Sequence, residues 1–472
     1  MQLPADFISS IRSLLREETD IFLASLSDET PVSIRLNLLK NRRNPLSFSV
    51  ENEKVKWSDT GYYLTKRPSF TFDPLFHAGY YYVQEAASMF VEQVVKQLID
   101  KPVRALDVCA APGGKSVALL SALPKGSVLI SNEIVRQRAN VLAETMTKFG
   151  NLNSIVTNNT PKDFAAFPHF FDLLLVDAPC SGEGMFRKEA VAVQEWSPAS
   201  VKVCAVRQRE ILRDVWMALK PNGLLIYSTC TYNLAENEDI AHWIADELGA
   251  EFVSLNVEKE WNISSAFNRS TICYRFFPHK TKGEGLFVAM LRKNDKQTHL
   301  SNKNRKKSLP FLKNDAAFRL FLQNPDSFDF AEENNRLIAL PKQHSEAFFL
   351  LRERLNILAA GIEIGERKGR DFIPSHSLAM STGLRLGAFP QYEVSYKQAI
   401  AYLRKEAIVL SDAPKGFVLL TFKNEPIGFV KNLGNRANNL YPLEWRIRSG
   451  FLREESGVFG VNGDVNRSKN VN

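Results

Sequence analysis

The chain has 472 residues, of which 44% are hydrophobic and 24% are charged. This length predicts about three domains, and the composition excludes a fibrous or a disordered protein. Sixty Lys and Arg against 52 Asp and Glu leave a net charge of +8. Such a charge favours a phosphate-rich partner if it is concentrated on one surface, and it is ordinary surface charge if it is spread evenly.

The cysteines and the apolar segments indicate a compartment. The five cysteines show no Cys-X-X-Cys spacing, which argues against a disulfide framework and against a zinc site. The N-terminal segment MQLPADFISSIRSLLREE lacks the basic start and apolar run of a signal peptide, and the chain contains no stretch of about 18 apolar residues. We therefore expect a cytoplasmic monomer with reduced thiols, no bound metal and no membrane span.

Residues 1–97 predict an accessory lobe. Apolar residues at helical spacing between Phe7 and Leu15 predict a helix, and SIRLNLL at 33–39 predicts a strand. The aromatic segment GYYYVQEAASM at 79–89 then leads into another helix.

Residues 98–294 predict a doubly wound α/β domain. Apolar runs occur there between helical segments, and each run is continuous rather than alternating with polar residues. Strands of this kind are usually buried on both faces, as in a parallel sheet covered by helices. The runs are RALDVCA (104–110), SVLISNE (127–133), NSIVTNN (153–159), FDLLLVDAP (171–179), GLLIYSTC (223–230) and GLFVAMLRK (285–293).

Beyond this domain the sequence predicts four segments. Residues 295–310 form a basic linker that is either a plain tether or an RNA contact. A middle domain of mixed character follows at 311–389. Residues 390–455 predict a compact unit with two strand-like runs around a Lys-Asn-Glu-Pro turn, and residues 456–472 predict a flexible tail.

The segment LDVCAAPGGKS at 106–116 predicts a cofactor site. It joins a strand end to a glycine turn and then to a helix, and Gly113 and Gly114 allow the backbone to come close to a ligand. The spacing differs from the GxGxxG of dinucleotide sites, so this turn favours a ligand without phosphate.

Polar residues at the ends of the next two runs suit a nucleoside. Glu133 lies where an acid typically receives the ribose hydroxyls, although an exposed helix-capping acid is the alternative. Asn158 and Asn159 could bind an adenine edge, or they could be ordinary turn residues.

Two cysteine motifs predict the reaction centre. Cys180 lies in DAPCSGEGMF and Cys230 in YSTCTYN, each at the end of an apolar run. Neighbouring ends of parallel strands meet at one edge of a sheet, so we expect both thiols to face the ligand crevice. A thiolate that adds to carbon 6 of a cytosine makes carbon 5 nucleophilic enough to accept a methyl group.

The remaining roles follow from this chemistry. Lys115 is a candidate cation for lowering the pKa of the nucleophile, and Asp177 is placed to stabilise charge at ring nitrogen 3. The second cysteine could act as the base that removes the carbon 5 proton. The residues alone do not decide which cysteine attacks. For the other three cysteines, we expect mainly a structural role as small buried hydrophobic residues. They are Cys109, Cys204 and Cys273.

Six motifs closely resemble the Sun family of RNA cytosine-5 methyltransferases, and within it the bacterial RsmF type that modifies 16S ribosomal RNA. They are SIRLN, YYVQEAASM, DVCAAPGGKS, VDAPCSGEGMFRK, STCTYNLAENE and NNLYPLEWR. The resemblance covers most of the chain. It implies a Rossmann-like α/β methyltransferase domain with a seven-stranded, mostly parallel sheet, together with an N-terminal lobe and a C-terminal PUA-like domain that both bind RNA.

The resemblance also assigns residues and partners. It implies that Cys230 is the nucleophile, that Cys180 helps to release the product, and that the substrate is 16S rRNA or the small ribosomal subunit. It implies S-adenosyl-L-methionine as the cofactor. The residues expected to bind it are Cys109, Ala110, Ala111, Pro112, Gly113, Gly114, Lys115, Glu133, Asn159 and Asp177.

The chain departs from the family pattern in two places. Many relatives carry an acid near the adenine where this chain has Asn158, Asn159 and Thr160. The basic GRxKN run of relatives is replaced by GNRANN at 434–439, which removes one basic residue from the expected RNA surface.

Basic and aromatic residues are interleaved near the second cysteine motif and in the C-terminal unit. This combination of phosphate contacts and stacking faces is typical of RNA-binding modules, although ordinary surface charges and core aromatics are the alternative. The residues are Arg187, Lys188, Lys423, Lys431, Arg436, Arg446 and Arg448 with Phe186, Phe429, Tyr441 and Trp445.

The same motifs bear on three other functions. A nicotinamide-dependent dehydrogenase would need GxGxxG where the chain has APGGK. A non-catalytic RNA-binding assembly factor would tolerate loss of a cysteine or of the glycine turn, and both are intact. Methylation of a cytosine in tRNA or in another rRNA by the same mechanism remains an alternative.

Overall fold

The computed structural model describes most of the chain. The described residues are 3–43, 46–48, 53–267, 271–294, 311–312, 316–333, 335–369, 371–449 and 458–460. The predicted basic linker at 295–310 lies outside them, as does the predicted tail apart from 458–460. Among the described helices, none is long and apolar enough to cross a membrane.

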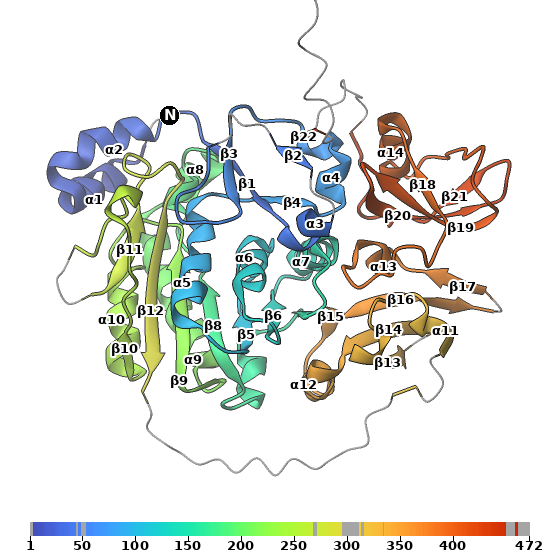
Figure 1. The fold of residues 1–472 in the computed structure, drawn as a ribbon. Helices are drawn as coiled ribbons and strands as arrows, with labels where there is room; N and C mark the ends of the chain where they lie inside the picture. Colours follow the sequence, from blue (N-terminus) through green and yellow to red (C-terminus); the bar gives the residue numbers. More distant parts are fainter. Residues whose placement is uncertain are drawn as a thin grey trace, which may run out of the picture.

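A large mixed sheet forms the centre of the molecule (Figure 1). Its strand order is β10-β12-β9-β8-β5-β6-β7-β15, and β11 pairs with β12. The five central strands are parallel and β12 is antiparallel to β9. All six predicted runs are strands, namely β5 (Arg104–Asp107), β6 (Val128–Asn132), β7 (Ser154–Thr157), β8 (Phe171–Asp177), β9 (Leu219–Thr229) and β12 (Leu286–Lys293).

The Rossmann-like class is confirmed, but the described sheet has nine strands rather than seven. Three of the nine strands lie outside the six predicted runs. Two of these three are short and pair with β12, namely β10 (Ala250–Phe252) and β11 (Cys273–Phe276). The third, β15 (Ile357–Ala360), comes from beyond the predicted linker and pairs antiparallel with β7. It covers the backbone groups that the edge strand would otherwise expose.

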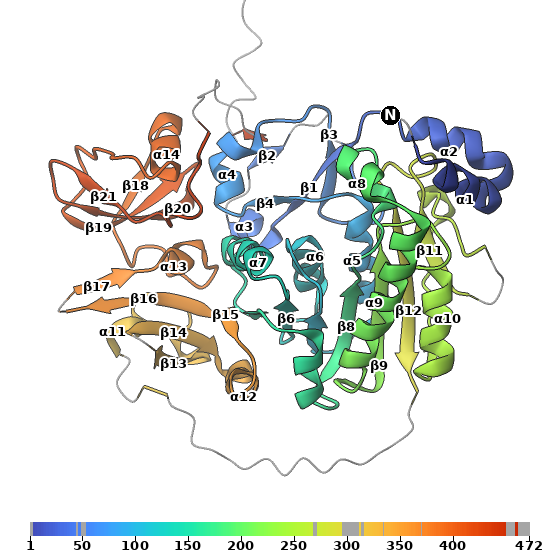
Figure 2. The same ribbon diagram turned by 180° about the vertical axis from the view of Figure 1, so that it is seen from behind.

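Helices cover both faces of the sheet (Figures 1 and 2). One face carries α5 (Val91–Leu98), α6 (Gly114–Ala122) and α7 (Arg136–Phe149), and the other carries α9 (Pro198–Trp216), α10 (Glu238–Glu247) and α12 (Lys342–Arg352). Every residue of β6 is buried, as its continuous apolar run predicts. The short α8 (Ala190–Glu195) follows the first cysteine loop.

In its described residues, the N-terminal lobe contains a three-stranded sheet and four short helices. The sheet order is β3-β1-β4. The elements are α1 (Ala5–Leu15), α2 (Thr19–Ser25), β1 (Val32–Leu36), α3 (Leu38–Arg43), β2 (Ser47–Phe48), β3 (Gly61–Leu64), α4 (Pro74–His77) and β4 (Tyr81–Val83). The predicted helix and the SIRLN strand are therefore both present, as α1 and β1.

The SIRLN segment joins the lobe to the catalytic domain. Asn37 is fully buried, and its side-chain amide donates to the carbonyls of Gly79 at 2.9 Å and Phe149 at 2.8 Å. Lys40 is also buried, and its ammonium donates to the Lys148 carbonyl at 2.9 Å. The carbonyls of the last residues of a helix have no N–H partner within the helix. Asn37 and Lys40 supply these missing donors at the end of α7.

The chain beyond the linker forms two smaller sheets. The first contains β13 (Phe328–Glu333), β14 (Arg336–Pro341), β16 (Ile362–Lys368) and β17 (Asp371–Pro374), with α11 (Ala316–Arg319) and α13 (His376–Met380). The second contains β18 (Gln391–Glu393), β19 (Gly416–Phe422), β20 (Glu425–Asn432) and β21 (Ala437–Asn439), with α14 (Tyr396–Leu403). A last strand, β22 (Phe459–Gly460), pairs with β2.

The predicted Lys-Asn-Glu-Pro turn is the hairpin between β19 and β20. Lys423 and Asn424 have φ values of 51° and 62°. Two successive residues with positive φ are typical of a tight hairpin turn whose twist matches that of the flanking strands. This unit packs against the N-terminal lobe through one shared apolar core, in which Tyr402 and Tyr441 lie with Leu75.

Asn37→Ala is expected to lower the free energy of unfolding by about 2 to 4 kcal/mol, because two buried carbonyls lose their donors. Urea denaturation measures this change. Asn438 is exposed on β21 and makes a suitable control, since Asn438→Ala should change stability by less than about 0.5 kcal/mol. Equal effects of the two substitutions would contradict the assigned role of Asn37.

Candidate active site

The predicted cofactor turn follows β5 and is enclosed by neighbouring elements. Gly113 has a φ of 118°, a conformation that favours glycine. A Cβ atom on Gly113 would lie 2.8 Å from the Thr145 side chain on α7, and one on Gly114 would lie 3.2 Å from the Tyr82 ring. Glycine is therefore favoured at position 113 by both the turn and close packing, and at position 114 by tight packing against Tyr82.

Glu133 lies beside this turn at the end of β6. It is only 3% exposed, and one carboxylate oxygen accepts a hydrogen bond from Val135 N at 2.9 Å. Arg138 lies 3.4 Å from the other oxygen and donates to the Ala111 carbonyl at 2.9 Å. Each carboxylate oxygen has a further acceptor site, so the group can still receive hydroxyl donors.

The asparagines after β7 have partners within the protein. Asn158 donates to the carbonyls of Glu133 and Ile134. Asn159 donates to the Asp163 carboxylate at 3.2 Å, and its amide oxygen accepts from Asn356 N at 2.9 Å. The adenine contact of Asn159 stays a prediction. Asp163, which the sequence did not single out, places an acid next to it.

The structure brings the two cysteines into contact. Cys180 follows β8 and Cys230 follows β9, and these strands are parallel neighbours. The two Sγ atoms are 3.2 Å apart. Gly184 N donates to the Cys230 carbonyl at 2.8 Å, and a Cβ atom on Gly184 would lie 2.8 Å from the same oxygen. Glycine in this loop therefore permits its close approach to the Cys230 strand end.

An ion pair lies next to the cysteines. The Lys115 ammonium is 2.8 Å from one Asp177 oxygen, and Ser228 donates to the other at 2.7 Å. Burial opposes the charged form of Lys115, but the negative charges of Asp177 and Cys230 outweigh it and raise the pKa of this lysine. The four predicted catalytic residues thus form one cluster.

The two thiols differ in their environments. The hydrogen bond to Cys230 and burial raise the pKa of Cys180 well above its usual range. Cys180 consequently keeps its proton at neutral pH and can donate it towards the Cys230 sulfur. Burial likewise raises the pKa of Cys109; the negative charges of nearby carboxylates add to this effect and Arg138 opposes it.

Acidic side chains that the sequence did not single out hold the two cysteine loops together. Glu183 is 1% exposed and accepts hydrogen bonds from the backbone N–H groups of Tyr232 and Asn233 at 2.7 and 3.0 Å. Glu236 accepts from Ser181 N at 2.9 Å and from the Asn233 amide at 2.8 Å. Each acid joins one loop to the other. The only signal in the sequence was their place inside the cysteine motifs.

The prediction that aromatic side chains stack on RNA is wrong for three residues. Phe186, Phe429 and Tyr441 are each at most 1% exposed and cannot offer a ring face to RNA. Phe186 packs against Phe7 of α1, with ring centroids 4.9 Å apart, so the tertiary packing of the lobe buries it. Trp445 is half-buried.

The predicted basic residues fall into two groups. Arg187 donates to the carbonyls of Gly283 and Glu29, and Lys188 pairs with Glu284 at 3.3 Å. Lys431 pairs with Asp371 at 2.8 Å. Lys188 is exposed in spite of this pairing, as are Arg436, Arg446 and Arg448, while Lys423 is half-buried.

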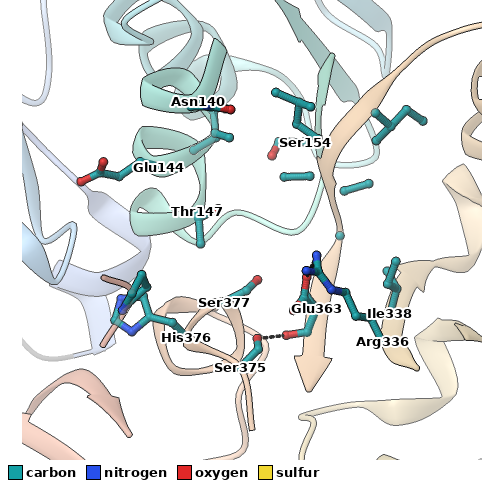
Figure 3. Close-up of a pocket in the computed structure, with 18 of the residues that line it drawn as sticks. Asn140, Glu144, Thr147, Ser154, Arg336, Ile338, Glu363, Ser375, His376 and Ser377 are labelled. Atoms are coloured by element: carbon teal, nitrogen blue, oxygen red, sulfur yellow. Dashed lines mark hydrogen bonds and ion pairs between the residues drawn. The ribbon is translucent and has the colours of Figure 1, made fainter. Parts of the chain in front are cut away.

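A separate cleft of about 1380 Å³ lies between α7, the β15 and β16 strands and the C-terminal unit (Figure 3). None of the predicted catalytic residues lines it. Its acids outnumber its basic residues, and two of its arginines are paired with glutamates. The charged lining residues are Glu144, Glu333, Glu363, Glu366 and Glu444 with Arg136, Arg336 and Arg352. This lining does not suit a phosphate backbone.

Asp107 ends β5 below the cofactor turn. It is fully buried, and its carboxylate accepts a hydrogen bond from Ser116 at 2.7 Å. Burial outweighs this hydrogen bond and raises the pKa of Asp107 to about 7. Asp177 raises it as well, while Lys115 acts in the opposite direction. The charge state of Asp107 is therefore linked to the catalytic ion pair.

Comparison with known proteins shows which family this chain resembles. A family model described as 16S rRNA methyltransferase RsmB/F matches residues 99–292. Models of the N-terminal domain of 16S rRNA methyltransferase RsmF and of the methyltransferase RsmF PUA domain match residues 3–86 and 389–447. Ribosomal RNA small subunit methyltransferase F from Aliivibrio fischeri strain MJ11 is 30% identical over 95% of this chain and 98% of its own length.

The chain belongs to the RsmF family of methyltransferases. Ribosomal RNA small subunit methyltransferase F from Escherichia coli O9:H4 strain HS is also 30% identical, over 95% of this chain and 97% of that protein. The RsmF assignment identifies the C-terminal unit as a PUA domain. The predicted resemblance is confirmed.

Two solved structures share the fold of this chain. A methyltransferase homolog protein from Pyrococcus horikoshii is 26% identical with a TM-score of 0.51, covering 60% of this chain and 93% of that chain. NSun6 from Pyrococcus horikoshii, solved with SFG, shares the fold with a TM-score of 0.52 at 18% identity, over 61% of this chain and 98% of that chain.

Asp107→Asn is expected to remove a pH dependence of stability. Folded Asp107 keeps its proton up to about pH 7, whereas the unfolded residue loses it near pH 4, so the wild type loses stability as the pH rises between these values. From pH 5 to pH 8 the unfolding free energy of the wild type should fall by about 2 to 3 kcal/mol relative to the variant. Urea denaturation at both pH values tests this. A constant difference would contradict the raised pKa.

Proposed function

We propose that this protein methylates carbon 5 of a cytosine in 16S rRNA, using S-adenosyl-L-methionine and a covalent bond between Cys230 and the base. The observation that carries the proposal is the 3.2 Å contact between the Cys180 and Cys230 sulfurs beside the Lys115–Asp177 ion pair. The RsmF relatives, which are named as small-subunit rRNA methyltransferases, support the choice of substrate.

The residues around the glycine turn fit the cofactor. The enclosed turn offers backbone and small side chains but no phosphate-binding glycine pattern, and Glu133 provides an acceptor for ribose hydroxyls. When bound, S-adenosyl-L-methionine supplies an electrophilic methyl group. The residues that would hold it are Cys109, Ala110, Ala111, Pro112, Gly113, Gly114, Lys115, Glu133 and Asp177.

In the first step the Cys230 thiolate adds to carbon 6 of the cytosine. The new S–C bond breaks the 5,6 double bond and moves an electron pair towards ring nitrogen 3, while carbon 5 becomes nucleophilic. The positive charge of Lys115, which lies next to Cys230, opposes the negative charge that accumulates on the ring, and Asp177 can stabilise ring nitrogen 3 by donating a proton that it first receives from Lys115. The resemblance of the STCTYN motif to that of the family's RNA enzymes supports Cys230 as the attacking group.

In the last step the proton on carbon 5 must leave. Cys180, once it has given its own proton to solvent, accepts this proton, and the electrons of the C–H bond restore the 5,6 double bond. The S–C bond to Cys230 breaks in the same step and Cys230 leaves as a thiolate. A thiol with a raised pKa gives a stronger base when it is deprotonated, which suits Cys180 for this role.

Cys230→Ala is expected to lower methyl transfer to 16S rRNA by at least about a thousandfold, because the nucleophile is lost. Tritiated S-adenosyl-L-methionine and nucleoside analysis for 5-methylcytosine measure the product. Cys204→Ala, which removes a thiol on α9 outside the cluster, is the matched control and should keep wild-type activity. Full activity of the Cys230 variant would overturn the assigned mechanism.

Cys180→Ala is expected to accumulate a covalent protein–RNA adduct, because the base that permits release is missing. The adduct should survive denaturation and migrate above the free protein in a denaturing gel. The double variant lacking Cys230 as well should form none. If Cys180→Ala turned over normally without an adduct, its role in release would be wrong.

A further inference from the structure

A buried arginine of the N-terminal lobe begins a chain of hydrogen bonds that reaches the cofactor turn. Arg35 on β1 is fully buried and pairs with Glu92 at 2.8 Å. Its guanidinium also donates to Thr60 at 2.7 Å and to the Gln84 side-chain oxygen at 3.0 Å. These three partners leave the arginine a single orientation.

Gln84 continues the chain to the turn. It follows β4 and is 5% exposed, and its side-chain nitrogen donates to the Gly114 carbonyl at 3.0 Å. Gly114 is the first residue of α6 and directly precedes Lys115. The Gln84 backbone is held as well, because its N–H donates to the Ser33 carbonyl at 3.1 Å.

The orientation of the Gln84 amide follows from its two partners. Arg35 can only donate hydrogen bonds and the Gly114 carbonyl can only accept them. The amide oxygen must therefore face the arginine and the nitrogen must face the turn. A glutamine held in this way can be neither flipped nor replaced by an acid without losing one of the two bonds.

We propose that Gln84 is a positioning residue for the cofactor turn, through which the N-terminal lobe fixes the Gly114 backbone in the arrangement that binds the methyl donor. The inference rests on the proposed function in one respect, namely that this turn holds S-adenosyl-L-methionine. Gln84 acts through Gly114 and not on the reacting atoms. It affects the affinity for the methyl donor and leaves the cysteine chemistry unchanged.

Two variants test this role. Gln84→Met keeps the size of the side chain and removes both hydrogen bonds, whereas Gln84→Glu keeps the bond to Arg35 and removes the donor to Gly114. Both should raise the Kd for S-adenosyl-L-methionine about 5- to 30-fold, measured by calorimetry on the full-length protein without RNA. In assays with RNA the KM for the methyl donor should rise by the same factor, while kcat at saturation and the KM for RNA stay within about twofold.

Gln97→Met is the matched control. Gln97 on α5 also donates a side-chain amide bond at 3.0 Å to a backbone carbonyl of the catalytic domain, that of Asn256, but it does not touch the turn. This variant should bind the methyl donor with the wild-type Kd. Thermal unfolding of all three variants, measured without ligand, separates a loss of stability from a loss of affinity.

A wild-type Kd in either folded Gln84 variant overturns the inference, as does an equal loss of affinity in the Gln97 variant. If Gln84→Met does not fold, Gln84→Glu decides, because it keeps the bond to the buried arginine. Failure of the proposed function has a different signature, since Cys230→Ala would then retain methyl transfer. The binding measurement uses no RNA and does not depend on which base is methylated.

Discussion

The parallel pairing of β8 with β9 is the constraint on which the site depends. Its register places Asp177 opposite Ser228, so the loops that follow begin side by side although 50 positions separate the two cysteines along the chain. Both strands are buried within the sheet, where a shift of register would break a row of hydrogen bonds and expose apolar residues. The sulfur–sulfur contact is therefore held by the core of the fold.

The loops themselves need additional support, which buried acids provide. Glu183 and Glu236 receive backbone and amide donors across the two loops, and Arg275, paired with Glu238, donates to the Tyr232 carbonyl at 2.8 Å. Such buried networks are costly unless every member is satisfied. They hold the cysteine loops in one arrangement and keep the two thiols in contact.

The N-terminal lobe is a structural part of the catalytic centre. Aromatic side chains on α1 and α2 pack on the cysteine loops, where Phe22 contacts Tyr232 with ring centroids 5.0 Å apart. Its SIRLN strand holds the end of α7 through Asn37 and the cofactor turn through Arg35 and Gln84. The SIRLN and YYVQEAASM motifs of the lobe thus contribute buried hydrogen bonds between the lobe and the catalytic domain.

The sequence by itself determined the six main strands, the glycine turn and the two cysteine motifs, because continuous apolar runs and short local motifs encode them directly. Only the tertiary structure decided that β15 crosses from a distant segment to cover the sheet edge, that Phe186, Phe429 and Tyr441 are buried, and that Gln84 links the lobe to the turn. These features depend on which surfaces meet across long stretches of chain. Residue type and spacing do not carry that information, since burial and hydrogen-bond partners are fixed by packing between elements.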